Sequence, residues 1–301
     1  MKCFFIYNPK SGKGIVLKNL PYIRQKLNEK FDEVVIYESK SKQDLEETVK
    51  IASTVYDVIV FSGGDGTFND VANAICECDK RPILGYLPLG TANDIARNLK
   101  IPRSVKGALK VVCNGLPIEH DVGKINDRYF IYVAGIGVCT DVSYRTDHKA
   151  KKVLGRFAYV LDGFNKFFTS PLNKIKITTE TEVIEENAPL VLVLNSMSVG
   201  GIRFHPYGHL NDGTFDIIVV KEGKDKGRFN VIKLFIGGLL GFRKKSGSTI
   251  IKSSKFKIEV SDDATWCTDG EEGPKGTIYV ENIPHHLQIL APRRKAKRQR
   301  K

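Results

Sequence analysis

The sequence has 301 residues, of which 42% are hydrophobic and 27% charged, with a formal net charge of +13. This balance is typical of a globular protein with room for two domains, and it excludes collagen-like and low-complexity chains. Seven of the positive charges lie within residues 293–301. We expect this basic tail to be solvated and disordered, attracting anionic lipid or nucleic acid or serving only solubility.

The six cysteines show neither a disulfide nor a zinc-site spacing, and no apolar run approaches the roughly 18 residues of a membrane span. The apolar stretch at the N-terminus is too short for a signal peptide. These features predict a protein of the reducing cytoplasm.

The first 120 residues alternate between patterns typical of strands and of helices. Ser41 and Thr67 each open a capping-box pattern, with Asp44 and Asp70 three residues later, which predicts the start of a helix. This alternation favours a parallel sheet with helices on both faces and a ligand site beyond the carboxyl ends of the strands. The expected strands are 2–7, 33–38, 57–61 and 82–87, and the first expected helix is 17–29.

After about residue 125 the pattern changes to one dominated by strands. A long amphipathic helix is expected over 147–168, and turn residues such as Asn211-Asp212-Gly213 separate the strand-like runs that follow. This pattern predicts an antiparallel, β-rich second domain. Residues 229–242 are apolar nearly all round and flanked by basic residues, so they form either a buried core helix or an element that dips into lipid head groups. The expected strands are 172–179, 188–195, 214–220, 249–260 and 276–281.

Three glycine-containing turns follow expected strands of the first domain, at residues 8–14, 63–67 and 90–94. The first turn lacks the spacing of a P-loop. Glycine lets the backbone approach a phosphate, and the N-terminus of a following helix attracts negative charge. Asp65 would repel a phosphate directly, so its place in the second turn indicates a Mg²⁺ ion between the two. Asp94 repeats this arrangement in the third turn.

These motifs resemble those of the soluble bacterial diacylglycerol kinase and lipid kinase family, within the diacylglycerol kinase catalytic domain superfamily. Gly-Gly-Asp-Gly-Thr at 63–67 is the hallmark that this family shares with the more distant NAD kinases and 6-phosphofructokinases. The resemblance covers the chain except for the basic tail. The companion motifs, in the order of the family, are Asn8-Pro9-x-Ser11-Gly12, Leu87-Pro-Leu-Gly-Thr91-Ala-Asn93-Asp94, Asp121-Val-Gly-Lys124, Asn211-Asp212-Gly213 and Asp269-Gly270-Glu271.

The resemblance implies an α/β protein of two domains with the active site in the cleft between them. A Rossmann-like, parallel α/β domain of residues 1–122, with about 283–292, would bind ATP. A β-rich, antiparallel and sandwich-like domain of residues 123–282 would bind the lipid. Thr91 would contact the nucleotide, and Ser39 stands where the family often has Thr. The residues expected to cradle the phosphates of ATP are Asn8, Pro9, Lys10, Ser11, Gly12, Gly64, Asp65, Gly66, Thr67, Phe68, Asn69 and Asp70.

The resemblance also implies a catalytic base in Asp269-Gly270-Glu271. Phosphoryl transfer requires positioning, charge neutralisation and an acceptor for the hydroxyl proton. Both acids are candidates, and we favour Asp269 with Glu271 as its close partner.

Two metal sites are expected. Asp65, Asp94 and Asp121 are the acids that we place around a catalytic Mg²⁺. A structural Mg²⁺, implied by the resemblance, would be held by the side chain of Asp212 and the backbone carbonyls of two nearby residues, His209 and Thr214.

The implied function is that of an ATP- and Mg²⁺-dependent kinase acting on a lipid hydroxyl, with diacylglycerol the first choice and phosphatidic acid its product. Such an enzyme would be cytoplasmic and peripheral, working on the anionic inner face of the membrane as a monomer or a homodimer. No nucleic-acid partner is expected, because no recognised binding motif occurs.

Two alternatives stay open. An NAD kinase-like enzyme is disfavoured by the Asp269-Gly270-Glu271 turn and by the missing Asn-Glu pair of that family. A catalytically silent regulator that senses a nucleotide or a lipid is disfavoured by the intact acids Asp65, Asp269 and Glu271.

Overall fold

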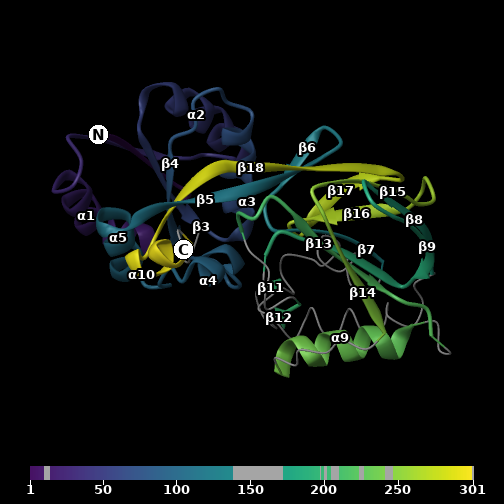
Figure 1. Ribbon diagram of the computed structural model, residues 1–301. Coiled ribbons are helices and arrows are strands. Elements are labelled where there is room, and N and C mark those ends of the chain that lie inside the picture. The colour runs from purple at the N-terminus through teal and green to yellow at the C-terminus, as the bar shows by residue number, and fades with distance from the viewer. Residues whose placement is uncertain are drawn as a thin grey trace. The chain divides into compact units, whose positions relative to one another are not determined.

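The structure is a computed structural model that describes residues 1–9, 14–137, 172–196, 198–199, 202–204, 210–223, 227–240 and 247–299. The chain forms two compact units, one of residues 1–121 and 285–301 and the other of residues 122–284 (Figure 1). The helix expected over 147–168, and the expected site residues Lys10, Ser11, Gly12 and His209, lie outside the described residues.

Unit 1 contains a parallel sheet in the order β2-β1-β3-β4, with the end of β18 next to β4. The central strands are continuous apolar runs whose side chains are buried on both faces, as expected for a parallel sheet covered by helices. The strands expected near residues 2, 33, 57 and 82 are therefore confirmed. Their bounds are β1 Lys2–Tyr7, β2 Glu33–Glu38, β3 Val58–Gly63 and β4 Ile83–Pro88.

Helices cover both faces of this sheet. Helix α2 (Lys42–Val55) packs on α3 (Asp65–Cys76), and α1 (Ile15–Asn28) packs on α5 (Val105–Asn114), with one pair on each face. The short helix α4 (Asp94–Leu99) follows β4. This doubly covered sheet is the expected Rossmann-like architecture.

The two expected capping boxes have different outcomes. The Ser41 side chain accepts a hydrogen bond from the Asp44 backbone N–H at 3.0 Å, so Ser41 caps α2 as predicted. The prediction for Thr67 is wrong, because α3 begins at Asp65 with Gly64 as its N-cap. Thr67 lies within the first turn of α3, so this helix starts directly at the end of β3 and directs its N-terminal N–H groups at the glycine turn.

The basic tail is also different from the expectation of a disordered arm. Residues Arg293–Gln299 form helix α10, and the first hydrogen bonds of this helix reach back to the carbonyl of Pro292. Ala296 is buried, and the Arg293 Nε–H donates to the Asn114 carbonyl at 2.9 Å. Ala296 and Arg293 therefore connect α10 to the rest of unit 1, although most of the side chains of this helix are long and basic.

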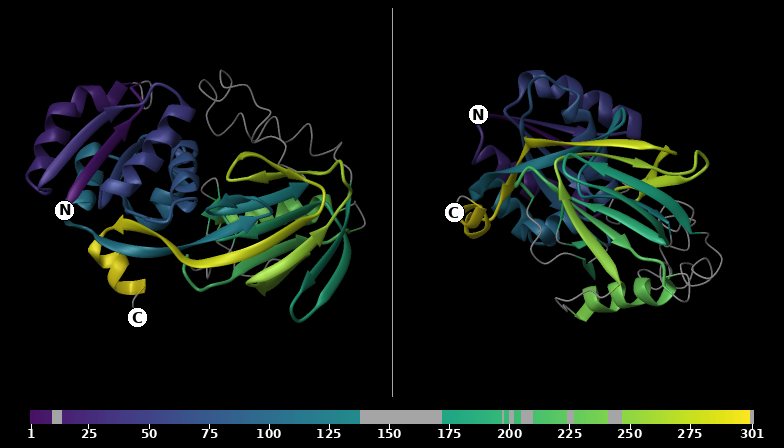
Figure 2. Two further views of the ribbon diagram at one scale, coloured as in Figure 1. Left: turned by 90° about the horizontal axis from the view of Figure 1, so that it is seen from above. Right: turned by 45° about the vertical axis from the view of Figure 1, so that its right-hand side comes forward.

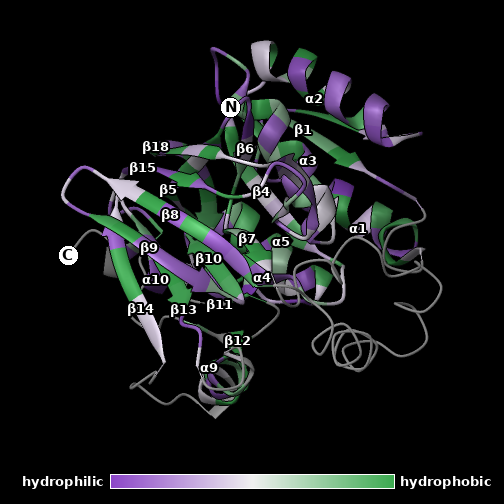
Figure 3. Cartoon of the chain, turned by 90° about the vertical axis from the view of Figure 1, so that its right-hand side faces the viewer, coloured by the Kyte–Doolittle hydropathy of each residue, from purple (hydrophilic) through white to green (hydrophobic). Residues whose placement is uncertain are grey.

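Unit 2 is built from two antiparallel sheets. One has the order β14-β13-β10-β7-β16-β17, and the other contains β18-β15-β8-β9, with β5 beside β18 and β6 beside β5. A single core of buried side chains from both sheets, including Trp266, Phe215 and Phe256, joins them into the expected sandwich. Figure 3 shows apolar and polar residues alternating along several of these strands.

The bounds of the unit 2 strands depart from expectation in three places. The run 249–260 is two strands, because the chain crosses between the sheets at Ser254. Strand β18 continues from Ile278 to Ala291 and is the long yellow strand of Figure 2. Eight described strands, β5 to β7, β9, β11, β12, β16 and β17, were not anticipated. The bounds are β5 Leu116–Ile125, β6 Arg128–Phe130, β7 Val133–Gly137, β8 Asn173–Thr179, β9 Val183–Ala188, β10 Leu190–Leu194, β11 Ser198–Val199, β12 Ile202–Arg203, β13 Phe215–Val220, β14 Ser248–Ser253, β15 Lys255–Glu259, β16 Thr265–Thr268 and β17 Glu271–Lys275.

Helix α9 (Arg228–Leu240) packs on β12 within unit 2. Among the helices that the structure describes, none has both the length and the apolar character needed to cross a membrane.

Candidate active site

Two of the three glycine turns, after β3 and after β4, come into direct backbone contact. The Leu89 N–H donates to the Gly63 carbonyl at 2.7 Å. A Cβ atom on Gly90 would lie 2.4 Å from the Cα of Gly64. Glycine is therefore required at this crossing, and the two turns form one continuous backbone surface beside the N-terminus of α3.

Asp65 connects the two turns through its side chain. One carboxylate oxygen accepts the Asn93 N–H at 2.7 Å and the other accepts the Asp94 N–H at 2.6 Å. Asp65 thereby caps the first turn of α4 from outside that helix. Burial raises the pKa of the Asp65 carboxyl above its ordinary value, while the backbone N–H donors act in the opposite direction.

Asn93 holds the third turn in shape. Its backbone is in the left-handed region, with φ 51°. Its Oδ1 accepts the Gly90 N–H at 2.9 Å, and its Nδ2 donates to the Gly90 carbonyl at 2.7 Å. The buried Tyr86 hydroxyl lies 3.2 Å from the same Oδ1. The turn is therefore ordered by its own side chain before any ligand binds.

The expected group of three metal-binding acids is not assembled. Asp94 is buried, and Asp121 is fully buried with one carboxylate oxygen accepting the His285 N–H at 2.8 Å. Within the described ranges, no three His, Cys, Asp or Glu side chains lie close enough together to hold a metal ion. The carboxylates of Asp65 and Asp121 each accept hydrogen bonds from backbone N–H groups.

The other expected nucleotide-binding residues lie around these turns. Asn8 and Pro9 follow β1, and the Ser39 N–H and hydroxyl donate to the Tyr7 carbonyl at 2.9 and 3.2 Å, so Ser39 adjoins the first turn. The Phe68 ring is buried against other rings, so its side chain belongs to the core and cannot contact a ligand. Gly66, Thr67 and Asn69 lie in the first part of α3, and Thr91 lies in the third turn.

Two basic residues near the turns were not anticipated. The Arg103 guanidinium donates to the carbonyls of Gly90 and Thr91. Lys42, at the start of α2, pairs with Asp70 at 2.7 Å. The sequence spacing between these residues and the glycine motifs does not predict that they lie near the turns, because the fold brings them to the turns from other elements. Both place positive charge where a phosphate chain would be favoured.

In unit 2, the Asp269-Gly270-Glu271 turn joins β16 to β17. Asp269 is buried and has a left-handed backbone with φ 51°. Its carboxylate accepts three backbone N–H groups, from Ile131 at 2.6 Å, Tyr132 at 2.9 Å and Val133 at 3.0 Å. Glu271 opens β17, opposite Thr268, and is only half-buried. Asp269 therefore anchors the turn to the start of β7.

The described part of the expected structural metal site already contains a cation. Asp212 Oδ1 accepts hydrogen bonds from the Thr214 backbone N–H at 3.2 Å and from the Thr214 hydroxyl at 3.0 Å. The ammonium of Lys252 lies 3.1 Å from Asp212 Oδ2 and 3.9 Å from Asp216. Lys252 thus supplies the positive charge that a metal would bring, and a Mg²⁺ ion beside it would be repelled. His209, the third expected ligand, lies outside the described residues, so the structural Mg²⁺ at Asp212 and Thr214 stays a prediction.

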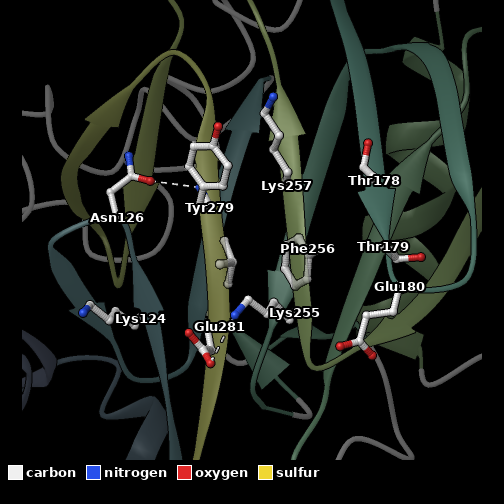
Figure 4. A pocket seen from close by; sticks show the side chains of 11 residues that line it. Lys124, Asn126, Thr178, Thr179, Glu180, Lys255, Phe256, Lys257, Tyr279 and Glu281 are labelled. Carbon is white, nitrogen blue, oxygen red and sulfur yellow. Dashed lines mark hydrogen bonds and ion pairs between the residues drawn. The ribbon is translucent and has the colours of Figure 1, made fainter.

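An open groove of about 450 Å³ lies on the outer face of unit 2, across β18, β15 and β8 (Figure 4). Lys255 pairs with Glu281 at 3.6 Å, and the Lys257 ammonium lies 5.5 Å from the centre of the Tyr279 ring. The groove contains none of the expected catalytic or nucleotide-binding residues. We assign no chemistry to it.

The two parts of the chain match two families. Residues 2–125 match the family described as "Diacylglycerol kinase catalytic domain". Residues 133–291 match the family described as "YegS C-terminal NAD kinase beta sandwich-like domain". The boundary between the matches lies near the change from unit 1 to unit 2.

Whole-chain relatives agree with both matches. A diacylglycerol kinase of Bacillus subtilis is 33% identical over 97% of this chain and 96% of its own length. A diacylglycerol kinase of Staphylococcus aureus is 34% identical over 95% of this chain and 91% of its own length. A crystal structure of a diacylglycerol kinase from Bacillus anthracis superposes with a TM-score of 0.81 at 30% identity, covering 96% of each chain. The chain therefore belongs to the diacylglycerol kinase family.

Proposed function

We propose that this protein transfers the γ-phosphate of ATP to the free hydroxyl of diacylglycerol, producing phosphatidic acid. The observation that carries the proposal is the pair of glycine turns joined by Asp65 at the N-termini of α3 and α4. Close-packed glycines, aligned N–H groups and nearby basic residues favour a polyphosphate. The relatives named above supply the choice of lipid.

We place ATP on the three turns of unit 1, and its phosphates against the backbone of the glycine turns. A Mg²⁺ ion brought by ATP would neutralise and orient those phosphates. Mg²⁺ needs only one or two carboxylates besides phosphate oxygens and water, so the missing cluster of three acids does not exclude it. Asp65 and Asp94 are the residues we propose to hold it, with Asp121 in a supporting role. The nucleotide would contact Asn8, Pro9, Lys10, Ser11, Gly12, Ser39, Gly64, Gly66, Thr67, Asn69, Asp70 and Thr91.

The sequence favours Asp269 as the catalytic base, but the hydrogen bonds within the turn favour Glu271 instead. Both oxygens of Asp269 already accept backbone N–H bonds, which stabilises its charge and weakens it as a proton acceptor. Glu271 belongs to the same turn, is only half-buried and has a longer side chain. We propose that Asp269 positions the turn and that Glu271 accepts the proton of the lipid hydroxyl during phosphoryl transfer.

We also propose a cytoplasmic protein that works at the inner face of the membrane, because its lipid substrate resides in a bilayer. The net charge of +13 favours an anionic surface. ATP is available on the cytoplasmic side.

An NAD kinase-like activity is the second candidate, favoured by the name of the family that residues 133–291 match. A screen with labelled ATP distinguishes the two, offering diacylglycerol, sphingosine and ceramide in mixed micelles with NAD⁺ as a competing acceptor. We expect label in phosphatidic acid, dependent on Mg²⁺. Label only in NADP⁺ would overturn the proposal, and no label in any acceptor would favour a silent regulator.

A further inference from the structure

We propose that one face of helix α9, formed by Phe229, Lys233 and Ile236, is the surface through which this protein binds an anionic lipid bilayer. This proposal rests on the proposed function, since an enzyme acting on a membrane lipid must reach the membrane. We call these three residues the α9 face. No other residue is included in this name.

The two sides of α9 differ in burial. Val231 and Leu234 are buried, and the Phe235 ring meets Phe204 edge-on with ring centres 5.2 Å apart, so this side holds the helix on unit 2. Phe229 is 63% exposed and Ile236 48% exposed, with the exposed Lys233 between them in sequence. Spacings of four and three residues place all three on one side of a helix. Figure 1 shows α9 as the green helix packed on unit 2.

The charge of the surrounding sequence indicates the chemistry of the partner. Residues 226–245 contain six basic residues and no acidic one. A helix with large apolar side chains on its exposed side and basic residues around it is typical of an element that lies in the head-group layer. At roughly 1.5 Å per residue its 13 residues extend about 20 Å, less than the ~30 Å core of a bilayer, so α9 would lie in the interface.

Charge also distinguishes a bilayer from a second copy of the chain. A twofold dimer through the α9 face would bring the same patch of each copy together. Lys233 of one copy would then lie near Lys233 of the other, and residues 226–245 offer no acidic residue to compensate the charge. Such a contact is disfavoured, whereas anionic head groups compensate the same charge.

Helix α2 offers a matched control surface on unit 1. Ile51 is 71% exposed and Val55 50% exposed, so α2 also presents two large apolar side chains. These residues are spaced by four and lie on one side of the helix. Unlike the surroundings of the α9 face, α2 itself carries acidic residues, namely Asp44, Glu46 and Glu47.

The first experiment measures co-sedimentation with vesicles of phosphatidylglycerol and phosphatidylcholine over a salt series. We expect Phe229→Ser with Ile236→Ser to weaken binding by about 10-fold or more at every salt concentration. The matched variant, Ile51→Ser with Val55→Ser, should bind like the wild type. Lys233→Glu should weaken binding at low salt only, because salt screens charge. Equal binding by the α9 and α2 variants would overturn the proposal.

The second experiment detects membrane contact directly, by a fluorescence signal, and does not require a variant to lose vesicle binding. Trp266 is the only tryptophan and is fully buried, so it is an internal reference. A tryptophan introduced by Phe229→Trp should shift its emission to shorter wavelength on vesicles and be quenched by brominated lipids. Ile51→Trp should show neither effect. An unquenched Phe229→Trp on vesicles that co-sediment the protein would show that another surface binds.

A third measurement separates this proposal from the proposed function. Phosphorylation of a short-chain diacylglycerol dispersed in water needs no bilayer, so the Phe229→Ser, Ile236→Ser variant should retain wild-type rates. If the wild type itself does not phosphorylate it, the proposed function fails, whatever the vesicles show. If the rates are normal but the wild type is a dimer that this variant converts to a monomer, the α9 face is a dimer interface and the lipid proposal is wrong.

Discussion

Replacing Asp269 by asparagine tests whether this residue is an anchor of the β16–β17 turn. The carboxylate of Asp269 accepts N–H groups from three consecutive residues, Ile131, Tyr132 and Val133, at 2.6 to 3.0 Å. The side chain of asparagine has one acceptor oxygen, and its NH₂ group can only donate. In either orientation of the side chain, the NH₂ group would therefore face at least one buried backbone N–H group, and that N–H group would lose its acceptor.

The cost follows from these contacts. An unsatisfied buried donor costs about 1–3 kcal/mol, and the remaining hydrogen bonds lose the assistance of the charge. We expect Asp269→Asn to lower the free energy of unfolding of unit 2 by about 2–4 kcal/mol. For a domain of this size the melting temperature should then fall by roughly 5–10 °C.

The assay combines thermal melting with steady-state kinetics. Asp269→Asn should lose both stability and activity, whereas Glu271→Gln should melt like the wild type and lose about 10²–10⁴ in kcat, the usual contribution of a general base. The exposed neighbour Glu272 provides the control Glu272→Gln, which should change neither. An Asp269→Asn protein that melts like the wild type but has no activity would refute this reasoning and restore Asp269 as the base.

Three further perturbations test other contacts. Gly90→Ala should weaken ATP binding measured by calorimetry, because the added Cβ would lie 2.4 Å from the Gly64 Cα; unchanged affinity would contradict the crossing of the turns. Wild-type melting should be the same in Mg²⁺ and in chelator, and Lys252→Met should melt a few degrees lower, because Lys252 neutralises Asp212; stabilisation of the wild type by Mg²⁺ would point to a metal. Burial lowers the pKa of His120 to about 4. The unfolded chain binds this proton near pH 6.5, so about 3 kcal/mol of stability should be lost between pH 6.5 and 4. The His120→Leu variant should not show this loss of stability when urea unfolding is measured at pH 6.5 and at pH 4. An equal loss of stability in the wild type and the variant would show that His120 is not its cause.

The parallel sheet of unit 1 was predictable because its strands are short apolar runs between clear turns. Ser41 also marks the start of α2, since its side chain caps the helix by a purely local contact. Strand β5 was missed because its buried positions include His120 and Asp121, and Asp121 is satisfied by a backbone N–H of residue 285. That contact spans most of the chain, so no local pattern reports it.

The motifs of the candidate site were visible in the sequence, but the use of their acids was not. The glycine turns predict a phosphate site, since glycine is the residue that permits close backbone approach. Whether an acidic side chain in such a turn points outward or caps a neighbouring helix depends on tertiary contacts. The Asp65 carboxylate accepts the N–H groups of residues 93 and 94, and the guanidinium of Arg103, which follows α4 in the chain, donates to the Gly90 carbonyl in the same turn.

Asp65 in unit 1 and Asp269 in unit 2 share one structural role. Each lies in a turn at the end of a strand, and each carboxylate accepts backbone N–H groups from a segment distant in sequence. A carboxylate suits this role because it has only acceptors, and it orders two segments together at a place where a ligand can approach. A loss of activity on replacing Asp65 would therefore have two causes, a lost metal ligand and lost order, whereas for Asp269 we expect lost order alone. Only variants compared at equal stability, such as Glu271→Gln beside Glu272→Gln, can assign the proton transfer to one side chain.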